Sequence, residues 1–183
     1  MRFLYVAGTP EVEHEALESI RDRVGATFGV PVRQLALPAI DFAFDAARRQ
    51  YSSAGVLEML MRTCPEDALK VLAVTERDLF IPVLTFVYGH AQLNGRVAAI
   101  SLARLRQEFY GLPANRQVFV ERAWKEALHE TGHTFGLVHC ADRQCAMALA
   151  TNIGQLDRKR DSFCAACAAR LGARLPQSPR SNP

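Results

Sequence analysis

The stretch HETGHTFGLVHC, residues 129–140, carries three histidines and a glutamate within eleven residues and ends on a cysteine. His129 and His133 are four positions apart, so on a helix both imidazoles project from one face and can reach a single metal ion. Gly136 can adopt the left-handed conformation that ends a helix and turns the chain sharply. We expect this turn to bring His139 back to the same metal as the third ligand.

The donor set predicts zinc chemistry of the catalytic kind. Three neutral nitrogens leave the fourth position of a tetrahedral zinc ion open to water, whereas structural zinc sites are closed. Glu130 is rotated by about 100° from His129, so it can reach that water without binding the metal. We therefore expect zinc to activate the water while Glu130 acts as general base, and later as general acid, in hydrolysis. The competing interpretation, a surface helix with solvated histidines, leaves the offsets of Gly136 and His139 unexplained.

Four cysteines, beginning with Cys140, follow the histidines in two close pairs. Cys140 and Cys145 form the first pair, and Cys164 and Cys167 form a Cys-x-x-Cys. Two such pairs separated by a short loop are typical of a closed four-cysteine zinc site, which contributes folding free energy where a segment is too small to bury a core. We expect a second, structural zinc here. The alternatives are unrelated free thiols or a redox pair, but a redox pair is expected near a strand–helix–strand unit, which is missing.

The composition limits the class of protein. The chain has 183 residues, of which 49% are hydrophobic, and a formal net charge of +3. This length suits one domain, and so mild a charge does not indicate nucleic acid as a partner. No signal peptide is visible, and no apolar run approaches the roughly 20 residues that a membrane span needs. We expect a cytoplasmic monomer with reduced cysteines and with no membrane or nucleic-acid partner.

Apolar runs and chain breakers predict alternating strands and helices. Strands are expected at residues 3–8, 30–37 and 70–76, with helices at 11–28 and within 41–64. Asn94-Gly95 between apolar runs predicts a hairpin within residues 84–105. This order favours a compact α/β (α+β) domain with a mixed, mostly parallel twisted sheet, a backing helix and an active-site helix.

The histidine-bearing helix is expected over about residues 116–135, with Asn115 as its N-cap. Its apolar stripe is predicted to pack inward, and the face that bears Arg122, Glu126 and the metal ligands is predicted to point away from the core. The expected organisation is a catalytic subdomain at residues 1–139, a small C-terminal subdomain at 140–175 and a disordered tail at 176–183.

Three other polar residues carry weaker signals. His90 follows a glycine; it could lie near the cleft, but a surface or turn histidine is the favoured expectation. Tyr88 and Tyr110 could each donate a hydrogen bond to an oxyanion, but their spacing gives no reason to choose between them.

Taken together, these motifs resemble the archaemetzincin family of metzincin zinc peptidases. The metzincin signature is His-Glu-x-x-His-x-x-Gly-x-x-His followed by a methionine-bearing turn. The archaemetzincin pattern adds a cysteine after the third histidine, a Cys-x-Met and a Phe-Cys-x-x-Cys, which here are Cys140, residues 145–147 and residues 163–167. The segments FDAARRQYSS, VTERDLFIP, LTFVYGHA and AISLARL are also similar, so the resemblance covers most of the chain.

The resemblance implies a zincin-like domain in which His129, His133 and His139 bind a catalytic zinc and Glu130 transfers the proton. It implies that Met147 forms a turn beneath the metal and that Cys140, Cys145, Cys164 and Cys167 hold a structural zinc. By the same resemblance, a strand within residues 97–105 lines the cleft and pairs with an extended substrate.

The favoured hypothesis is a zinc-dependent peptidase with two zinc ions per chain, which acts on a peptide or protein substrate. One alternative is a zinc-stabilised binding module that cleaves weakly or not at all; the presence of Glu130 favours hydrolysis over this. Another is a hydrolase of a non-peptide amide, which uses the same chemistry and which the motif does not exclude.

Overall fold

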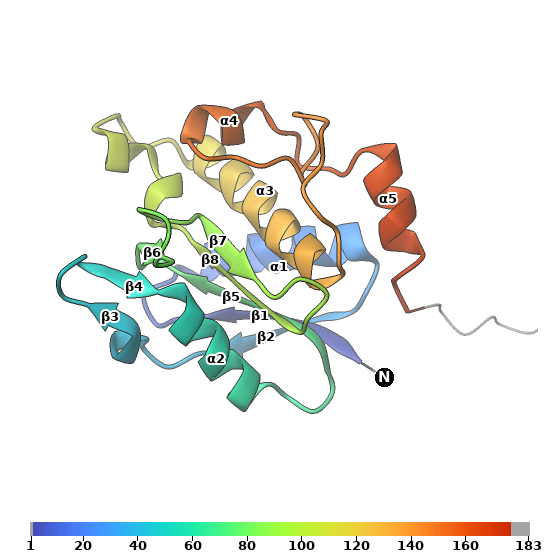
Figure 1. Cartoon of the computed structure of the whole chain (residues 1–183), viewed down its shortest axis with the longest axis horizontal. Coiled ribbons are helices and arrows are strands. Elements are labelled where there is room, and N and C mark those ends of the chain that lie inside the picture. The colour runs from blue at the N-terminus through green and yellow to red at the C-terminus, as the bar shows by residue number, and fades with distance from the viewer. Residues whose placement is uncertain (1, 177–183) are drawn as a thin grey trace, which may run out of the picture.

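The computed structural model describes residues 2–176, and its main feature is a five-stranded sheet in the order β2-β1-β5-β8-β7 (Figure 1). The strands are β1 (Phe3–Gly8), β2 (Val32–Ala36), β5 (Ala68–Thr75), β7 (Gly89–Ala91) and β8 (Val97–Ser101). All neighbouring strands pair in parallel except β7, which runs antiparallel to β8. The predicted mixed, mostly parallel sheet is therefore confirmed. Of the predicted tail, residues 177–183 lie outside the described part of the chain.

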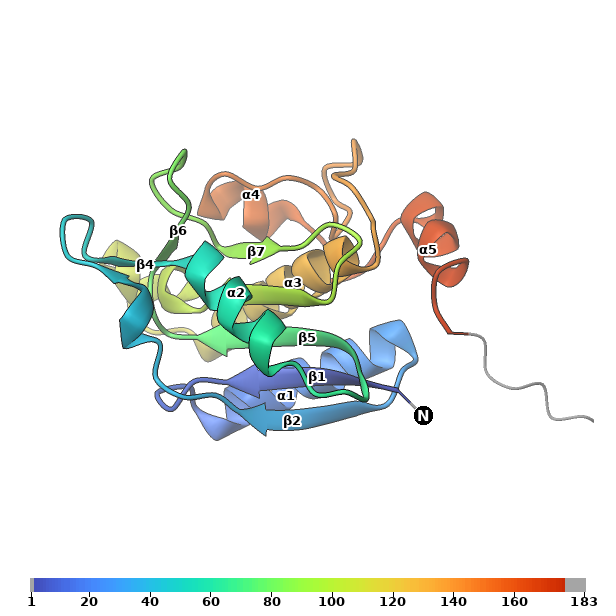
Figure 2. The same ribbon diagram turned by 60° about the horizontal axis from the view of Figure 1, so that its bottom comes forward.

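Helices cover both faces of this sheet (Figures 1 and 2). They are α1 (His14–Phe28), α2 (Ser53–Thr63) and α3 (Arg116–Thr134). Leu4 and Val6 of β1 pack in one apolar cluster with α1 and α3. Tyr5 and Ala7 pack in a second cluster with α2. Successive side chains of a strand point to opposite faces, so this division follows from the strand geometry.

A second sheet has three short strands, two before α2 in the chain and one after it. Its strands, in the order β3-β4-β6, are β3 (Phe44–Asp45), β4 (Gln50–Ser52) and β6 (Leu79–Phe80), and a 3-10 turn, η1 (Asp41–Ala43), comes before them. Strands of two or three residues are too short to show an alternating pattern, so the sequence does not predict them. The helix expected within residues 41–64 is confirmed from Ser53, where the Ser52 hydroxyl accepts a hydrogen bond from the Gly55 N–H at 3.3 Å.

The predicted hairpin joins β7 to β8. Asn94 has a φ of 55°, in the left-handed region, and the Gly95 N–H donates to the Gln92 carbonyl at 3.0 Å. The Asn94 N–H also donates to the carbonyl of His133 at 2.9 Å. The hairpin therefore holds the C-terminal end of α3 beside β7.

The ends of α3 lie where the sequence predicts them, but its packing differs. The Asn115 side chain accepts from the Val118 N–H at 3.1 Å, and Gly136, just beyond the helix, has a φ of 80°. Arg122 and Glu126, on the face predicted to point outward, are only 4% and 3% exposed. The prediction of one-sided packing is wrong because the C-terminal segment covers this face.

The covering segment follows the third histidine and contains two helices, α4 (Ile153–Arg158) and α5 (Ala165–Gly172). Two 3-10 turns, η2 (Ala103–Leu105) and η3 (Gln107–Tyr110), connect β8 to α3. Met147 and Leu156 are fully buried in the same apolar cluster as α1 and α3. Among residues 2–176, no helix combines the length and the hydropathy required to cross a bilayer.

Candidate functional site

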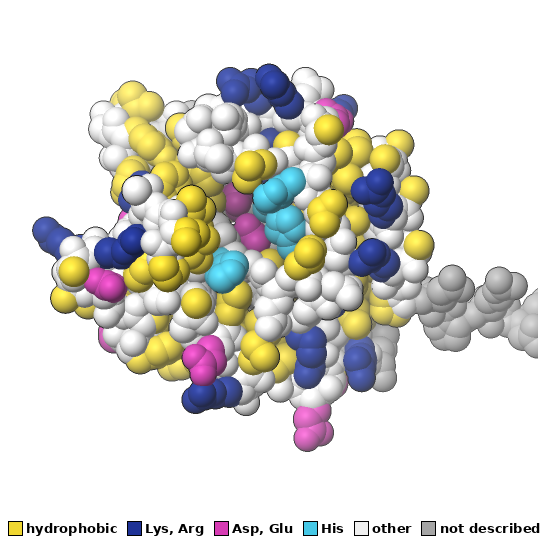
Figure 3. Space-filling view, in the orientation of Figure 1, with side chains coloured by type: hydrophobic (Ala, Val, Ile, Leu, Met, Phe, Trp, Pro, Cys, Tyr) yellow, Lys and Arg dark blue, Asp and Glu magenta, His cyan; other side chains and the backbone are white. Residues whose placement is uncertain are grey.

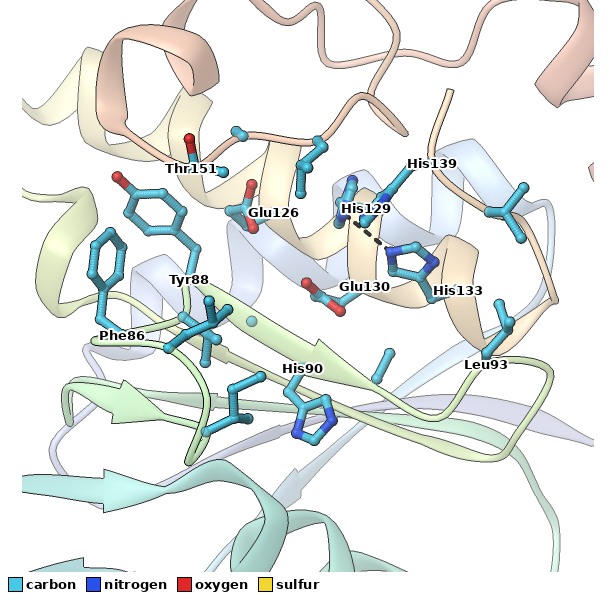
Figure 4. Close-up of a pocket in the computed structure, with 18 of the residues that line it drawn as sticks. Phe86, Tyr88, His90, Leu93, Glu126, His129, Glu130, His133, His139 and Thr151 are labelled. Carbon is cyan, nitrogen blue, oxygen red and sulfur yellow. Dashed lines mark hydrogen bonds between the residues drawn. The ribbon is translucent and has the colours of Figure 1, made fainter. Parts of the chain in front are cut away.

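A cleft of about 570 Å³ lies between α3, β7 and the segment that follows the third histidine. Residues 81–88, before β7, form one wall, and residues 138–151 contribute to the other. In the space-filling view the surface is hollowed here, with histidines around the opening and acidic side chains within it (Figure 3). The close-up shows how these side chains converge from the helix and the strand (Figure 4).

The three predicted histidine ligands meet in this cleft. The Nε2 atoms of His129 and His133 lie 3.1 Å apart, as the dashed line in Figure 4 marks. The ring of His139 lies 5.3 Å and 5.0 Å from the rings of His129 and His133, measured between centroids. One nitrogen from each ring lies within 4.8 Å of the other two. The left-handed turn at Gly136 thus does what the sequence predicts.

The hydrogen bonds of the imidazoles make this cluster fit a metal ion. The Nδ1 of His129 donates to the Ala146 carbonyl at 2.8 Å, and the Nδ1 of His133 donates to the Leu137 carbonyl at 2.7 Å. A carbonyl only accepts, so in the neutral imidazoles the protons are on Nδ1 and both Nε2 lone pairs face each other. Two acceptors at this separation need a cation between them. Zinc–nitrogen bonds of about 2.0–2.1 Å imply nitrogens about 3.3 Å apart in a tetrahedron, which matches this pair.

The environment keeps the histidines neutral. Burial lowers the pKa of His129 well below its ordinary value, and the nearby ammonium of Lys159 lowers it further. Burial also lowers the pKa of His133 and of His139. Neutral imidazole is the form that binds a metal, so the cluster is ready to do so near pH 7.

Glu130 lies on α3 between the two helical histidines, and its carboxylate enters the cleft beside them (Figure 4). It is 5% exposed. Burial raises the pKa of its carboxyl well above the ordinary value, the carboxylate of Glu126 raises it further, and Lys159 opposes both. A carboxylate with a raised pKa is a stronger base, as a group that accepts a proton in catalysis needs to be.

Two buried charges beside the histidines are absent from the predicted site. Lys159 Nζ lies 3.5 Å from Glu126 Oε1 and 3.3 Å from His129 Nδ1, and both charged side chains are almost fully buried. Glu126 lines the cleft one helical turn before Glu130. That spacing is a signal that could have identified Glu126, whereas Lys159 comes from a distant segment with no local pattern.

Two of the weaker sequence candidates also line the cleft. His90, expected at the surface or in a turn, is half-buried on β7, and its Nδ1 lies 3.0 Å from the Ser53 hydroxyl, so that expectation is wrong. Tyr88 is 5% exposed and reaches the cleft near Glu126 (Figure 4). Tyr110 is 40% exposed and donates to the Arg104 carbonyl at 2.9 Å. Of the two tyrosines, only Tyr88 lines the cleft.

The strand beside the cleft is β7, not a strand within residues 97–105. β8 (Val97–Ser101) pairs with β5 on one side and with β7 on the other, so it has no edge for a substrate, and the prediction is wrong. On either side of β7, the Tyr88 carbonyl accepts from the Ser101 N–H, and the Gln92 N–H donates to the Val97 carbonyl, so both groups are bonded toward β8. Antiparallel hydrogen bonding alternates along a strand, so Gly89 and Ala91 direct their N–H and C=O groups away from β8, toward the cleft.

The C-terminal segment is held against α3 at several points. The Arg122 guanidinium donates to both carboxylate oxygens of Asp157, at 2.7 Å and 2.8 Å. Met147 is fully buried against the helical turn that carries the histidines: a Cβ added to Gly132 would lie 2.6 Å from its Sδ. The turn beneath the metal that the family resemblance implies for Met147 stays a prediction.

The four predicted cysteines form a separate cluster. Their sulfurs lie within 4.8 Å of one another, and Cys140 Sγ and Cys164 Sγ are 3.7 Å apart. Zinc–sulfur bonds of about 2.3 Å imply sulfurs about 3.8 Å apart, so the cluster fits a tetrahedral zinc ion. The backbone N–H of Cys167 lowers the pKa of Cys164 to about 7, and the Cys145 sulfur accepts hydrogen bonds from the N–H groups of Met147 and Cys164, at 3.4 Å and 3.3 Å.

Comparisons with known proteins identify the family to which the chain is similar. Residues 16–173 match the model of peptidase family M54. The archaemetzincin of Methanocaldococcus jannaschii is 42% identical over 164 residues, which cover 88% of each chain. The archaemetzincin of Pyrococcus furiosus is 38% identical over 172 residues, which cover 90% of each chain.

Solved structures of similar proteins share the fold over nearly the whole chain. The crystal structure of archaemetzincin from Methanopyrus kandleri has a TM-score of 0.83 at 32% identity and covers 96% of this chain and 95% of its own. The archaemetzincin of Archaeoglobus fulgidus, crystallised with malonate, has a TM-score of 0.80 at 32% identity and covers 92% of this chain and 99% of its own.

Proposed function

Because the chain belongs to peptidase family M54, the archaemetzincins, and is a zinc metallopeptidase, we propose that it hydrolyses peptide bonds at the cleft between α3 and β7. In this proposal His129, His133 and His139 hold the catalytic zinc and Glu130 transfers the proton. The observation that carries it is the pair of Nε2 lone pairs facing each other at 3.1 Å beside the buried carboxylate of Glu130.

The residues of the chain would share the chemistry as follows. Zinc held by the three imidazoles would supply a Lewis acid and lower the pKa of water toward about 7. The Glu130 carboxylate accepts the proton that the attacking water loses, and its raised pKa makes it a competent base. The same carboxyl then donates that proton to the nitrogen of the leaving amine. The Nδ1 hydrogen bonds to the Ala146 and Leu137 carbonyls keep two imidazoles oriented throughout.

An extended peptide would bind along β7. The N–H and C=O groups of Gly89 and Ala91 that point toward the cleft would pair with its backbone as an added strand, which tolerates many sequences. Apolar side chains from the loop before β7, including Phe86, and from the facing wall, including Leu149, would contact its side chains. The substrate class is therefore a peptide, or an unfolded stretch of protein, with apolar residues near the cleaved bond.

The second zinc of the proposal is structural. Cys140, Cys145, Cys164 and Cys167 would hold it as a closed site, and their sulfur spacing supports this. We keep the division at residue 139 as part of the proposal, with residues 140–175 stapled by this ion. The proposal also retains a monomer that acts in the cytoplasm without nucleic acid, where thiols remain reduced.

A binding module that does not cleave is the weaker alternative. Such a module needs no base, yet Glu130 lies in the cleft with its carboxyl pKa raised by burial. A hydrolase of a non-peptide amide would use the same residues, so only a substrate test separates it from a peptidase.

A peptide-library digest provides that test. Purified wild type and Glu130→Gln are incubated with a mixed-sequence library, cleavage is mapped by mass spectrometry, and zinc is measured in each protein. We expect cleavage by wild type, none by Glu130→Gln, and equal zinc in both. Equal cleavage by both proteins would reject Glu130 as the proton carrier. The absence of cleavage by zinc-loaded wild type, with release of amine from small amides, would reject the peptide substrate.

A further inference from the structure

Gly89 of β7 lies directly against the side chain of Glu130. A Cβ added to Gly89 would lie 2.4 Å from Glu130 Cγ and 2.7 Å from both Cδ and Oε1. Carbon atoms do not approach to such distances, so any side chain at this position displaces Glu130. All three nearest atoms belong to Glu130, so a side chain at position 89 would overlap with Glu130 first.

The backbone at Gly89 gives no other reason for a glycine. Gly29, Gly111 and Gly136 have positive φ angles, but Gly89 does not, and it pairs regularly with Ile100 of β8. Glycine weakens a strand because it loses more conformational freedom on folding and packs no side chain. At a strand position that any residue could adopt, the close approach of Glu130 is what requires glycine.

Glu130 has no easy way to avoid a side chain at position 89. The closest atom is Cγ, so rotation of the carboxylate alone leaves the overlap in place, and the side chain must turn about χ1 or the strand must separate from α3. Glu126 lies one turn back on the same face, and the two metal-binding histidines of the helix flank Glu130. Alanine at position 89 would therefore move the carboxylate away from its present place in the cleft.

We propose that Gly89 is a positioning residue, whose bare backbone seats the Glu130 carboxylate between the edge strand and the histidine cluster. This inference rests on the proposed function of Glu130. It also links two parts of the reaction: Gly89 directs its N–H and C=O toward the cleft, so the residue that seats the base also pairs with the substrate. Gly89 would then position both the peptide bond to be cleaved and the carboxylate that acts as its base.

The first test compares Gly89→Ala with a matched control, Gly55→Ala. An added Cβ at Gly55, in α2, meets only ordinary contacts of 3.7–3.9 Å. With one quenched fluorescent peptide chosen from the library, we expect Gly89→Ala to keep its zinc and to lower kcat about 100-fold, as a misplacement of about 1 Å can. Its KM should stay within about twofold, since the pairing groups of the strand backbone remain. Gly55→Ala should match wild type.

Other outcomes overturn the proposal. A kcat close to wild type for Gly89→Ala, or a raised KM with unchanged kcat, would do so, as would loss of zinc, which would assign Gly89 to the metal site instead. Glu130→Gln is measured in parallel. If Glu130→Gln retains activity, the proposed function itself fails. If Glu130→Gln is inactive but Gly89→Ala is active, only the positioning role of Gly89 is rejected.

A second test needs no substrate. Thermal unfolding is measured for Gly89→Ala, Glu130→Ala and the double variant, because truncating Glu130 removes the three atoms that lie nearest to an added Cβ at position 89. We expect Gly89→Ala to lower Tm in the wild-type chain and to leave Tm unchanged, or to raise it, in the Glu130→Ala chain. If Gly89→Ala does not fold, recovery of folding in the double variant supports the contact. An equal loss in both backgrounds contradicts it.

Discussion

The histidine cluster and the cysteine cluster adjoin in the chain at His139 and Cys140, yet they offer a metal ion different surroundings. The histidines present three nitrogens to a cleft, with the carboxylates of Glu126 and Glu130 beside them. The cysteines present four sulfurs, two of them on buried residues. An open donor set with a base nearby suits chemistry, whereas a closed donor set suits the stabilisation of a small segment.

The two clusters are also mechanically linked. The Cys140 N–H donates to the Met147 carbonyl at 2.9 Å, and the Cys145 sulfur accepts from the Met147 N–H at 3.4 Å. Met147 packs against Gly132, within the helical turn that carries the histidines. These contacts connect the cysteine cluster to the turn of α3 that carries the histidines.

The largest contrast is expected from removal of one ligand at each cluster. His133→Ala should abolish hydrolysis and leave the resistance of residues 140–175 to proteolysis unchanged. Cys164→Ala should expose that segment to proteolysis, because a structural zinc contributes up to about 10–16 kcal/mol to the folding of small zinc domains. Limited proteolysis and peptide cleavage, measured on the same samples, check both expectations. If the two variants were equally sensitive to proteolysis, the distinction between a catalytic histidine cluster and a structural cysteine cluster would be rejected.

Lys159→Met should destabilise the chain by about 3–5 kcal/mol, because Glu126 is then a buried charge without its partner. Urea unfolding measures the loss. Adding Glu126→Gln to this variant should recover most of the loss, since the buried charge that Lys159 paired with is then removed. A double variant as unstable as Lys159→Met would show that packing, not charge, is what Lys159 provides.

Cys140→Ser should weaken zinc binding at the histidines without altering a histidine. His139 is the neighbouring residue, so loss of the rigid anchor should reduce affinity about 10–100-fold, as for other groups that orient a ligand. Competition with a chelator, followed at the histidine site of each variant, gives this affinity. Cys164→Ser is the matched comparison, because Cys164 has no histidine neighbour. If both variants lower the zinc affinity of the histidine site equally, Cys140 has no special role in orienting His139.

The smallest expected effect is on the pH dependence of the unfolding free energy of the zinc-free chain. The carboxyl of Glu130 has a folded pKa raised above 4.5, so the folded state keeps a proton that the unfolded chain loses, and stability falls as pH rises through that interval. Glu130→Gln removes this penalty. Its advantage over wild type should be nil below pH 4.5 and should grow by about 1.4 kcal/mol per pH unit up to the raised pKa. A pH-independent difference in urea unfolding would show that Glu130 is not desolvated.

Local patterns predicted which histidines and which cysteines cluster. The spacing of His129 and His133, the left-handed turn at Gly136 and the paired cysteines each depend on residues close in sequence, where helix periodicity and turn preferences decide the outcome. The hairpin at Asn94-Gly95 belongs to the same class.

Tertiary packing decided what the sequence did not show. The outer face of α3 reads as polar, yet Arg122 is buried because Asp157 arrives from α4 to pair with it. Lys159 reaches the histidines only after the C-terminal segment folds over the helix. The exposed edge belongs to β7 because the hairpin places this short strand outside β8, and strand order is not a local property.

The measurement that tests the central claim most directly is X-ray absorption at the zinc edge of the purified chain, with the zinc content determined on the same sample. Two zinc ions per chain, one with three nitrogens and an oxygen and one with four sulfurs, predict an average shell of about two nitrogen or oxygen atoms near 2.0–2.1 Å and two sulfurs near 2.3 Å. His133→Ala should shift that average toward sulfur. A single zinc with four sulfurs in wild type, unchanged by His133→Ala, would contradict an open zinc site at the histidines.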